Sequence, residues 1–237
     1  MKICILTAHP NDSVSCCGGT IAKYAEQGHE VIDICATLGH ALRPDLPADE
    51  VARKRGEERA KAHKILGTSE VRNLDYRDTE VEYTRGLIAE ITDILREIKP
   101  EVVITYWWQN IHPDLRNFST AVSDATIFSA FYFPSKYPPH TVKKIYEFGY
   151  LNSVNYKPEF FVDITDYIDK KVKALQEFKL IDELLRQWQG PKSKGYVDQV
   201  LSVNRSEGKL ASVTYAESFR EFFAVETKSR ALNMLPT

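Results

Sequence analysis

The first half of the chain alternates short apolar runs with longer segments of helical periodicity. Four apolar runs predict strands at residues 3–7, 31–36, 70–74 and 102–106. Amphipathic helices are expected from the spacing of apolar residues at 20–28, 49–66 and 84–98, and again after residue 114. Such alternation predicts parallel strands joined by right-handed crossovers, and therefore an α/β fold with a doubly wound, mostly parallel sheet flanked by helices.

The second half of the chain is less regular. Two further strands are expected at residues 142–148 and 159–164. Helical segments are expected at residues 166–178, 181–188, 196–203 and 215–223. The Gly-, Pro- and Ser-containing segment 189–195 predicts a mobile loop, and 134–140 predicts a Pro-rich connection. We expect one domain over residues 1–226 and a loosely held tail at 227–237.

Composition narrows the class of protein. Of the 237 residues, 43% are hydrophobic and 27% are charged, as in ordinary globular chains. A formal net charge of -2 argues against general affinity for nucleic acid or anionic membranes. No run approaches the ~20 apolar residues that span a bilayer, and the first apolar run is too short for a signal peptide. The expected localisation is therefore cytoplasmic. In such a reducing compartment, Cys4 and Cys35 are expected to be small buried side chains.

Two polar clusters follow strands directly. His9-Pro10-Asn11-Asp12 follows the first predicted strand, and His112-Pro113-Asp114 follows the fourth. Ligands of doubly wound sheets bind beyond the carboxyl ends of the strands, where the strand order reverses. If these two strands are neighbours at that point, both clusters face one crevice.

The residue types of these clusters suit a metal ion or an acid–base pair. His9 and Asp12 are candidate ligands of one divalent ion, and Asp114 is a candidate acceptor that orients a neighbouring histidine. Either cluster by itself is more often a helix cap or a turn. The two together favour a functional site.

Several motifs then resemble those of the LmbE/PIG-L N-deacetylases. Ala8-His9-Pro10-Asn11-Asp12, followed by Gly18-Gly19-Thr20, resembles the family's AHPDD...GGT signature. Further likenesses are Arg55-Gly56-Glu57-Glu58, His112-Pro113-Asp114-Leu115-Arg116, Asp163-Ile164-Thr165-Asp166-Tyr167, Gly195-Tyr196-Val197 and Tyr215-Ala216-Glu217. The later segments are most similar to the branch that deacetylates the N-acetylglucosamine–malate conjugate of bacillithiol synthesis. The resemblance covers roughly residues 1–225 and implies a Rossmann-like, LmbE-like fold.

The resemblance also implies roles for individual residues. It places His9 and Asp12 as zinc ligands, Asn11 at the position of the general base, and His112 and Asp114 as acid and orienter. The third ligand position is Leu115. Leucine has no lone pair for a metal, and catalytic zinc normally has three protein ligands besides water. An amide does not take a proton from water near neutral pH, so both the zinc site and the base are incomplete.

Other side chains are candidates for contact with a substrate. Arg55 and Arg116 suit an anionic or hydroxyl-rich molecule, although surface ion pairs are the alternative. Trp107 is a candidate stacking residue or a core contact, and Tyr196 is a candidate for closing over a ligand or an ordinary loop residue. Candidates for replacing the lost groups are Cys16 or Cys17 at the first helix and His40 after the second strand, whose plainer interpretations are helix packing and an exposed loop.

Three hypotheses of function follow. The first is a divergent enzyme that acts on a small polar, amino-sugar-like metabolite with changed chemistry or without zinc. The second is a metal-dependent N-deacetylase or amidase with a rebuilt metal site. The third is a non-catalytic binding protein or partner subunit. In each case we expect a small-molecule ligand, and the resemblance implies a homo-oligomer.

Overall fold

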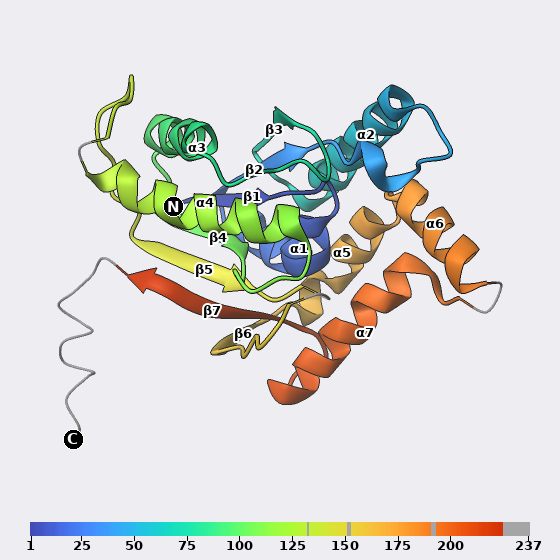
Figure 1. Cartoon of the computed structure of the whole chain (residues 1–237). Helices are drawn as coiled ribbons and strands as arrows, with labels where there is room; N and C mark the ends of the chain where they lie inside the picture. The colour runs from blue at the N-terminus through green and yellow to red at the C-terminus, as the bar shows by residue number, and fades with distance from the viewer. Residues whose placement is uncertain (132, 151–152, 191–192, 225–237) are drawn as a thin grey trace.

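The strands of this computed structural model form one mixed sheet in the order β3-β2-β1-β4-β5-β7-β6 (Figure 1). The structure describes the chain except residues 132, 151–152, 191–192 and 225–237, so the predicted tail and part of the predicted mobile loop lie outside the described residues. The strands are β1 Lys2–Thr7, β2 Glu30–Thr37, β3 Glu70–Tyr76, β4 Val102–Tyr106, β5 Lys144–Phe148, β6 Phe160–Asp163 and β7 Ala216–Ala224.

The predicted doubly wound sheet is confirmed. β1, β2, β3, β4 and β5 pair in parallel, whereas β7 runs antiparallel to both β5 and β6. The chain moves from β1 outward through β2 to β3 and then returns to place β4 on the other side of β1. The strand order therefore reverses between β1 and β4, which are direct neighbours.

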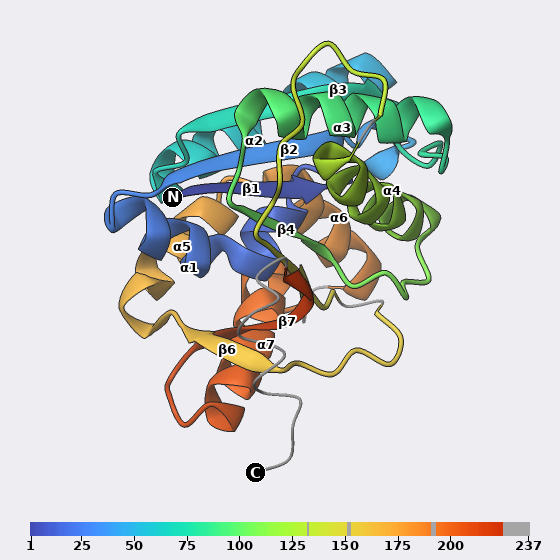
Figure 2. The same ribbon diagram turned by 90° about the vertical axis from the view of Figure 1, so that its left-hand side faces the viewer.

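Helices cover both faces of this sheet (Figure 2). The helices are α1 Asp12–Glu26, α2 Ala48–Leu66, α3 Arg85–Ile98, α4 Pro113–Ala130, α5 Ile168–Leu175, α6 Lys179–Gln189 and α7 Gly195–Leu210. Single 3-10 turns lie at η1 His40–Leu42 and η2 Thr165–Tyr167. α3 packs against α4 on one face, and α1, α2 and α5 contact one another on the other. None of the described helices is long and apolar enough to cross a membrane.

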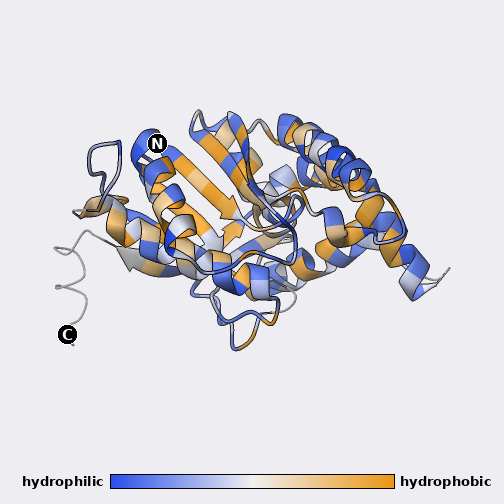
Figure 3. Cartoon of the chain, turned by 45° about the horizontal axis from the view of Figure 1, so that its top comes forward, coloured by the Kyte–Doolittle hydropathy of each residue, from blue (hydrophilic) through white to orange (hydrophobic). Residues whose placement is uncertain are grey.

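The core follows the apolar pattern of the sequence. In α3, the predicted stripe of Leu87, Ile88, Ile91 and Leu95 is buried, and the Thr84 side chain accepts the Leu87 N–H to begin the helix. Figure 3 shows apolar central strands beneath helices with polar outer surfaces. Hydrophobic burial therefore fixes which face of each helix meets the sheet.

One predicted helix is wrong. Residues 215–223 were expected to be helical, but β7 spans Ala216–Ala224. Its register with β5 pairs Ile145 with Phe223, and its register with β6 pairs Phe160 with Phe219. The segment therefore joins β5 to β6, and backbone pairing in the sheet outweighs its helical spacing.

Helix α1 is broken near its middle. Cys17 has non-helical backbone angles (φ -139°, ψ 23°). The buried Glu217 carboxylate accepts the N–H groups of Gly19 and Thr20, at 2.8 and 2.7 Å, and the Lys171 Nζ donates to the Ser15 carbonyl at 2.7 Å. These two side chains, themselves 2.7 Å apart, satisfy the backbone groups that the break releases.

The glycine pair of α1 allows another element to pack closely. A Cβ on Gly19 would lie 2.6 Å from the side chain of Ile164, so any larger residue would displace the segment after β6. The break and the close contact together fix the first turns of α1, which carry Asp12.

Candidate functional site

The two predicted polar clusters meet at the point where the strand order reverses. His9 and Asn11 lie between β1 and α1, and His112 lies between β4 and α4. Because β1 and β4 are parallel neighbours, their carboxyl ends lie side by side. We call the group formed by His9, Asn11, Asp12, Arg55, Asp78, His112 and Asp114 the His9–His112 site.

His9 is surrounded by three carboxylates. Its Nε2 lies 3.1 Å from Asp78 and 3.2 Å from Asp114, and its Nδ1 lies 3.4 Å from Asp12. Burial by itself lowers the pKa of His9, but the hydrogen bonds with the three aspartates outweigh this effect and hold the pKa well above its usual range. Both ring nitrogens therefore face negative charge.

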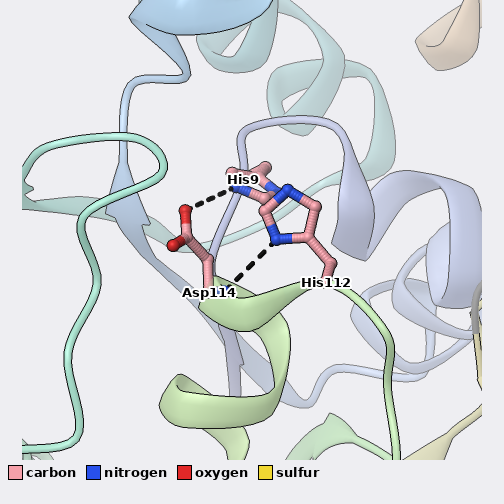
Figure 4. A group of neighbouring side chains, drawn as sticks. All are labelled: His9, His112 and Asp114. Atoms are coloured by element: carbon pink, nitrogen blue, oxygen red, sulfur yellow. Dashed lines mark hydrogen bonds and ion pairs between the residues drawn. The ribbon is translucent and has the colours of Figure 1, made fainter.

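His112 begins helix α4 and makes an edge contact with His9. The centroids of the two rings are 4.9 Å apart (Figure 4). The His112 Nδ1 accepts the Asp114 N–H at 3.2 Å, so a neutral His112 carries its proton on Nε2. Burial and the nearby His9 lower the pKa of the half-buried His112. The side chain is therefore a neutral donor beside a charged ring.

Asp114 is a buried anchor rather than a free carboxylate. It accepts the N–H of Thr79 at 2.7 Å and the N–H of Val81 at 3.2 Å, besides its contact with His9. These bonds hold the segment after β3 against α4. That segment includes Asp78. Burial by itself raises the pKa of Asp78, but the hydrogen bond and the charge of His9 outweigh this effect and lower the pKa to about 2.

Asn11 and Asp12 form a second hydrogen-bonded layer. The Tyr106 hydroxyl donates to Asp12 and accepts the Ala8 N–H at 2.8 Å. Asn11 donates from Nδ2 to Asp12 at 3.2 Å and to the Tyr196 hydroxyl at 3.0 Å. The polar groups of this layer are thus largely satisfied by one another.

Arg55 fixes the orientation of Asn11. The Arg55 guanidinium, which is 3% exposed, donates to the Asn11 Oδ1 at 2.5 Å and to the Gly39 carbonyl at 3.3 Å. Because arginine only donates, the atom it contacts is the amide oxygen, and the Nδ2 group must face Asp12 and Tyr196. The surroundings of Asn11 therefore match an amide.

The zinc arrangement that the resemblance implies does not fit these residues. Leu115 is 1% exposed and packs in the hydrophobic core. Both nitrogens of His9 face carboxylates, and Asp12 accepts hydrogen bonds from Tyr106 and Asn11. The position of the third zinc ligand holds a hydrocarbon side chain, which offers no donor atom. The two other ligand residues, His9 and Asp12, already pair with groups of the protein.

A different set of possible ligands does lie together. One ligand atom each from His9, His112 and Asp114 lies within 4.8 Å of the others (Figure 4). Two imidazoles and a carboxylate are donor types that divalent metals accept. This set differs from the one that the resemblance implies, because His112 and Asp114 enter it and Asp12 does not.

The side chains of the remaining candidate residues make contacts outside the His9–His112 site. Trp107 is 9% exposed, donates to the Val154 carbonyl at 2.9 Å, and packs beneath Arg220. Arg116 donates to the Asn110 carbonyl at 2.9 Å. His40 lines a hollow of about 220 Å³ beside α2 and β3.

Two residues at the first helix behave as their plainer interpretations predicted. Burial raises the pKa of Cys16 and of Cys17 well above the usual range, which keeps both as thiols. Tyr196 was a candidate for closing over a ligand or an ordinary loop residue; it lies in α7, where a helix was predicted from residue 196, is 4% exposed and bonds to Asn11.

Sequence reasoning missed Asp78 and Tyr106. Asp78 comes two residues after β3 ends, and Tyr106 is the last residue of β4. Both are polar groups at the carboxyl end of a strand, as His9 and His112 are, although only Tyr106 belongs to a strand at the reversal, since β3 lies at the edge of the sheet. Looking for such a group at every strand would have found them.

Comparisons with known proteins agree with this architecture. The family description "PIG-L: GlcNAc-PI de-N-acetylase" matches residues 4–126. The diacetylchitobiose deacetylase of Thermococcus kodakarensis is 28% identical over 232 residues, which cover 92% of this chain and 82% of the relative. The probable N-acetyl-alpha-D-glucosaminyl L-malate deacetylase 2 of Bacillus anthracis is 26% identical over 185 residues, 73% of this chain and 78% of the relative.

A solved structure supports the same conclusion. The N,N'-diacetylchitobiose deacetylase from Pyrococcus horikoshii superposes with a TM-score of 0.81 at 27% identity, covering 96% of this chain and 88% of that one. More than half of the chain matches the family description, and the predicted motifs meet at one site. The chain therefore belongs to the PIG-L (LmbE-like) family, that of GlcNAc-PI de-N-acetylase.

Proposed function

We propose that the protein binds a small polar, amino-sugar-like metabolite at the His9–His112 site and acts on it without the zinc-activated water of its deacetylase relatives. The proposed ligand class is supported by the names of the relatives, which are deacetylases of N-acetylated amino sugars. The observation that carries the changed chemistry is the burial of Leu115, 1% exposed, at the position of the third ligand.

Leu115 contributes to packing, not to coordination. Burying a leucine side chain stabilises a fold by roughly 1.5–3 kcal/mol. A histidine at the same position would have to bury a polar ring in this apolar contact unless a partner satisfied it. The wild-type residue therefore favours stability over a metal contact.

Asn11 stands at the position of the general base, the second group that hydrolysis in this family requires. Its Nδ2 group donates to Asp12 and Tyr196, which a carboxylate could not do. An amide orients a water molecule but does not deprotonate it, and losing a general base typically costs ~10²–10⁴ in rate. The hydrogen-bond network around Asn11 thus supports a function other than base-assisted hydrolysis.

The groups that remain suit recognition and proton transfer. The Nε2–H of His112 is a donor for a carbonyl or hydroxyl oxygen, and Asp114 holds the histidine pair in place. A neutral imidazole donor polarises a bound carbonyl without carrying a net charge. We assign His112 the contact with the ligand, and Asp114 and Arg55 the roles of positioning residues.

Binding and hydrolysis are separated by one experiment on the full-length protein. Titration calorimetry with N,N'-diacetylchitobiose is expected to show binding, while the same mixture releases no acetate above the rate without protein. His112→Ala is expected to weaken binding by about three- to tenfold, the loss of one hydrogen bond. His29→Ala, which changes a histidine beside the N-terminus, is the control. Rapid acetate release by the wild-type protein, or no binding at all, would overturn the proposal.

A second candidate function is a metal-dependent amidase with a rebuilt site. The observation in its favour is the grouping of His9, His112 and Asp114 within 4.8 Å. In this case metal analysis of protein purified without chelator gives about one divalent ion per chain, and both His112→Ala and chelation remove that ion together with amidase activity. Protein that is metal-free as purified, and that binds no added zinc or manganese, rejects this candidate.

A further inference from the structure

The described residues line an open cavity of about 530 Å³, and none of His9, His112 and Asp114 lies in its wall. It lies between the first turns of α1, the connection after β5, helices α6 and α7, and β7. Its wall includes Tyr150, Leu185, Tyr196, Val203, Asn204 and Glu207. A volume of this size is typical of small-molecule sites, which range from roughly 300 to 1,000 Å³.

Asn11 connects this cavity to the His9–His112 site. Its Nδ2 donates to the hydroxyl of Tyr196 at 3.0 Å and lies 3.5 Å from the hydroxyl of Tyr150, and both tyrosines line the cavity. Its Oδ1 faces the other way and accepts from Arg55. The cavity therefore adjoins the site, with Asn11 as the shared polar group.

The wall is unsuited to an anion. Among the described residues that line the cavity there is no lysine, arginine or histidine. The charged group present is the Glu207 carboxyl, whose pKa is raised by burial and whose oxygen accepts the Ser218 hydroxyl. Aliphatic side chains from α6 and α7 and three tyrosine rings supply most of the remaining wall. Uncharged, mainly apolar groups gain the most binding free energy from a wall of this kind.

One buried acceptor in the wall has no protein partner. The Asn204 Nδ2 donates to the Ala216 carbonyl at 3.0 Å, but its Oδ1 accepts no hydrogen bond from the part of the chain that the structure describes. The side chain is 2% exposed. This oxygen is sealed from solvent, so it does not decide which groups the cavity accepts.

We propose that this cavity binds an uncharged, mainly apolar group. The group has one of two sources. The first is the substituent of an amino-sugar conjugate whose sugar occupies the His9–His112 site, and this source rests on the proposed function. The second is a separate molecule. Both sources share the same chemistry, and the experiment distinguishes them.

Titration calorimetry with matched probes tests the proposal. Methyl and butyl N-acetyl-β-D-glucosaminide differ by three methylenes, and each methylene buried in the cavity is expected to tighten binding about three- to fourfold. Hexan-1-ol tests a separate molecule, and hexanoate is its charged counterpart. We expect hexan-1-ol to bind more tightly than hexanoate, because the wall offers no cation to the carboxylate.

Substitutions in the wall locate the binding. Val203 in α7 and Leu185 in α6 are partly exposed, so Val203→Trp and Leu185→Trp are expected to fill the cavity without unfolding the protein. Either change is expected to remove the gain from the butyl chain and the binding of hexan-1-ol. Ser202→Trp adds the same ring to an exposed position of α7 and is expected to leave both unchanged.

The outcomes separate this inference from the proposed function. A butyl gain that Val203→Trp removes supports the conjugate as the source. Hexan-1-ol binding that Val203→Trp removes, without binding of either glycoside, supports a separate molecule and contradicts the proposed function. Equal affinity for the two glycosides together with no binding of hexan-1-ol overturns the inference and leaves the proposed function standing.

Discussion

Two groups of histidines and aspartates lie close to β1 and β2, and they differ in what surrounds them. In the buried cluster, Asp33 of β2 contacts Arg59 and His63 of α2, and all three side chains are at most 1% exposed. In the His9–His112 site, the His9 side chain is 14% exposed and His112 is half-buried. Similar residue types are therefore sealed in one place and reachable in the other.

The difference follows from position along the strands. Asp33 lies in the middle of β2, where helix α2 covers it, and the Arg59 guanidinium occupies the space beside its carboxylate. His9 and His112 follow the ends of their strands, in the turns that lead into α1 and α4. A buried charge pair stabilises a particular packing, whereas a group beyond a strand end is placed to meet a ligand. Histidine and aspartate together do not mark a site unless their position is considered.

The largest expected effect is on the buried cluster. Arg59→Leu leaves the Asp33 carboxylate buried without its guanidinium partner, and removing one partner of a buried pair typically costs about 3–5 kcal/mol. Urea unfolding followed by circular dichroism measures this loss. Arg53→Ala breaks an exposed pair with Glu57 in the same helix and is expected to cost at most about 0.5 kcal/mol. Equal losses in the two variants would remove the distinction between the regions.

A smaller effect is expected at the anchor of the site. Asp114→Asn keeps one carbonyl oxygen for the two N–H groups of Thr79 and Val81, so one of them loses its acceptor. The expected cost is about 1–3 kcal/mol in stability, together with weaker ligand binding. Asp198→Asn on the exposed side of α7 is the matched control. Full ligand binding by Asp114→Asn would show that the anchor does not position His9.

The smallest expected effect is a pH dependence of the buried cluster. Burial raises the pKa of Asp33, but the charges and hydrogen bonds of His63 and Arg59 outweigh it, and the pKa falls below its usual range. A lowered folded-state pKa contributes stability above the unfolded value, near 3.9, and that contribution is lost as the pH falls through the folded-state value. The deficit of Asp33→Asn relative to the wild type should therefore shrink by about 1–2 kcal/mol between pH 5 and pH 2. A constant deficit in urea unfolding would contradict this assignment.

Much of the parallel half of the fold could be predicted from the sequence. Apolar runs separated by helical periodicity predicted β1 to β4 and a doubly wound sheet, because local pattern and sheet topology agree there. The pairing of β1 with β4, which the sequence left as a condition, is what the structure adds. β7 could not be predicted in this way. Its Phe219, Phe222 and Phe223 have helical spacing, and the partners that make it a strand, β5 and β6, are distant in the sequence.

Most residues of the site were candidates from the sequence, but Asp78, Tyr106 and the connections between the residues were not foreseen. His9 and His112 could be brought together because strand ends determine their place. The contact of Arg55 with Asn11 and that of Asn11 with Tyr196 join residues 44 and 185 positions apart, and no local pattern encodes them. The adjoining cavity was likewise not visible, because its wall comes from five segments of the chain.

The central claim is tested most directly by the zinc content of protein purified without chelator. Wild-type protein is expected to carry far less than one zinc per chain, because a hydrocarbon stands where the third donor is needed. Leu115→His is expected to raise the content toward one zinc per chain, and Leu115→Gln, a polar change without an imidazole, is expected to leave it low. One firmly bound zinc per wild-type chain, unchanged in both variants, would contradict the account.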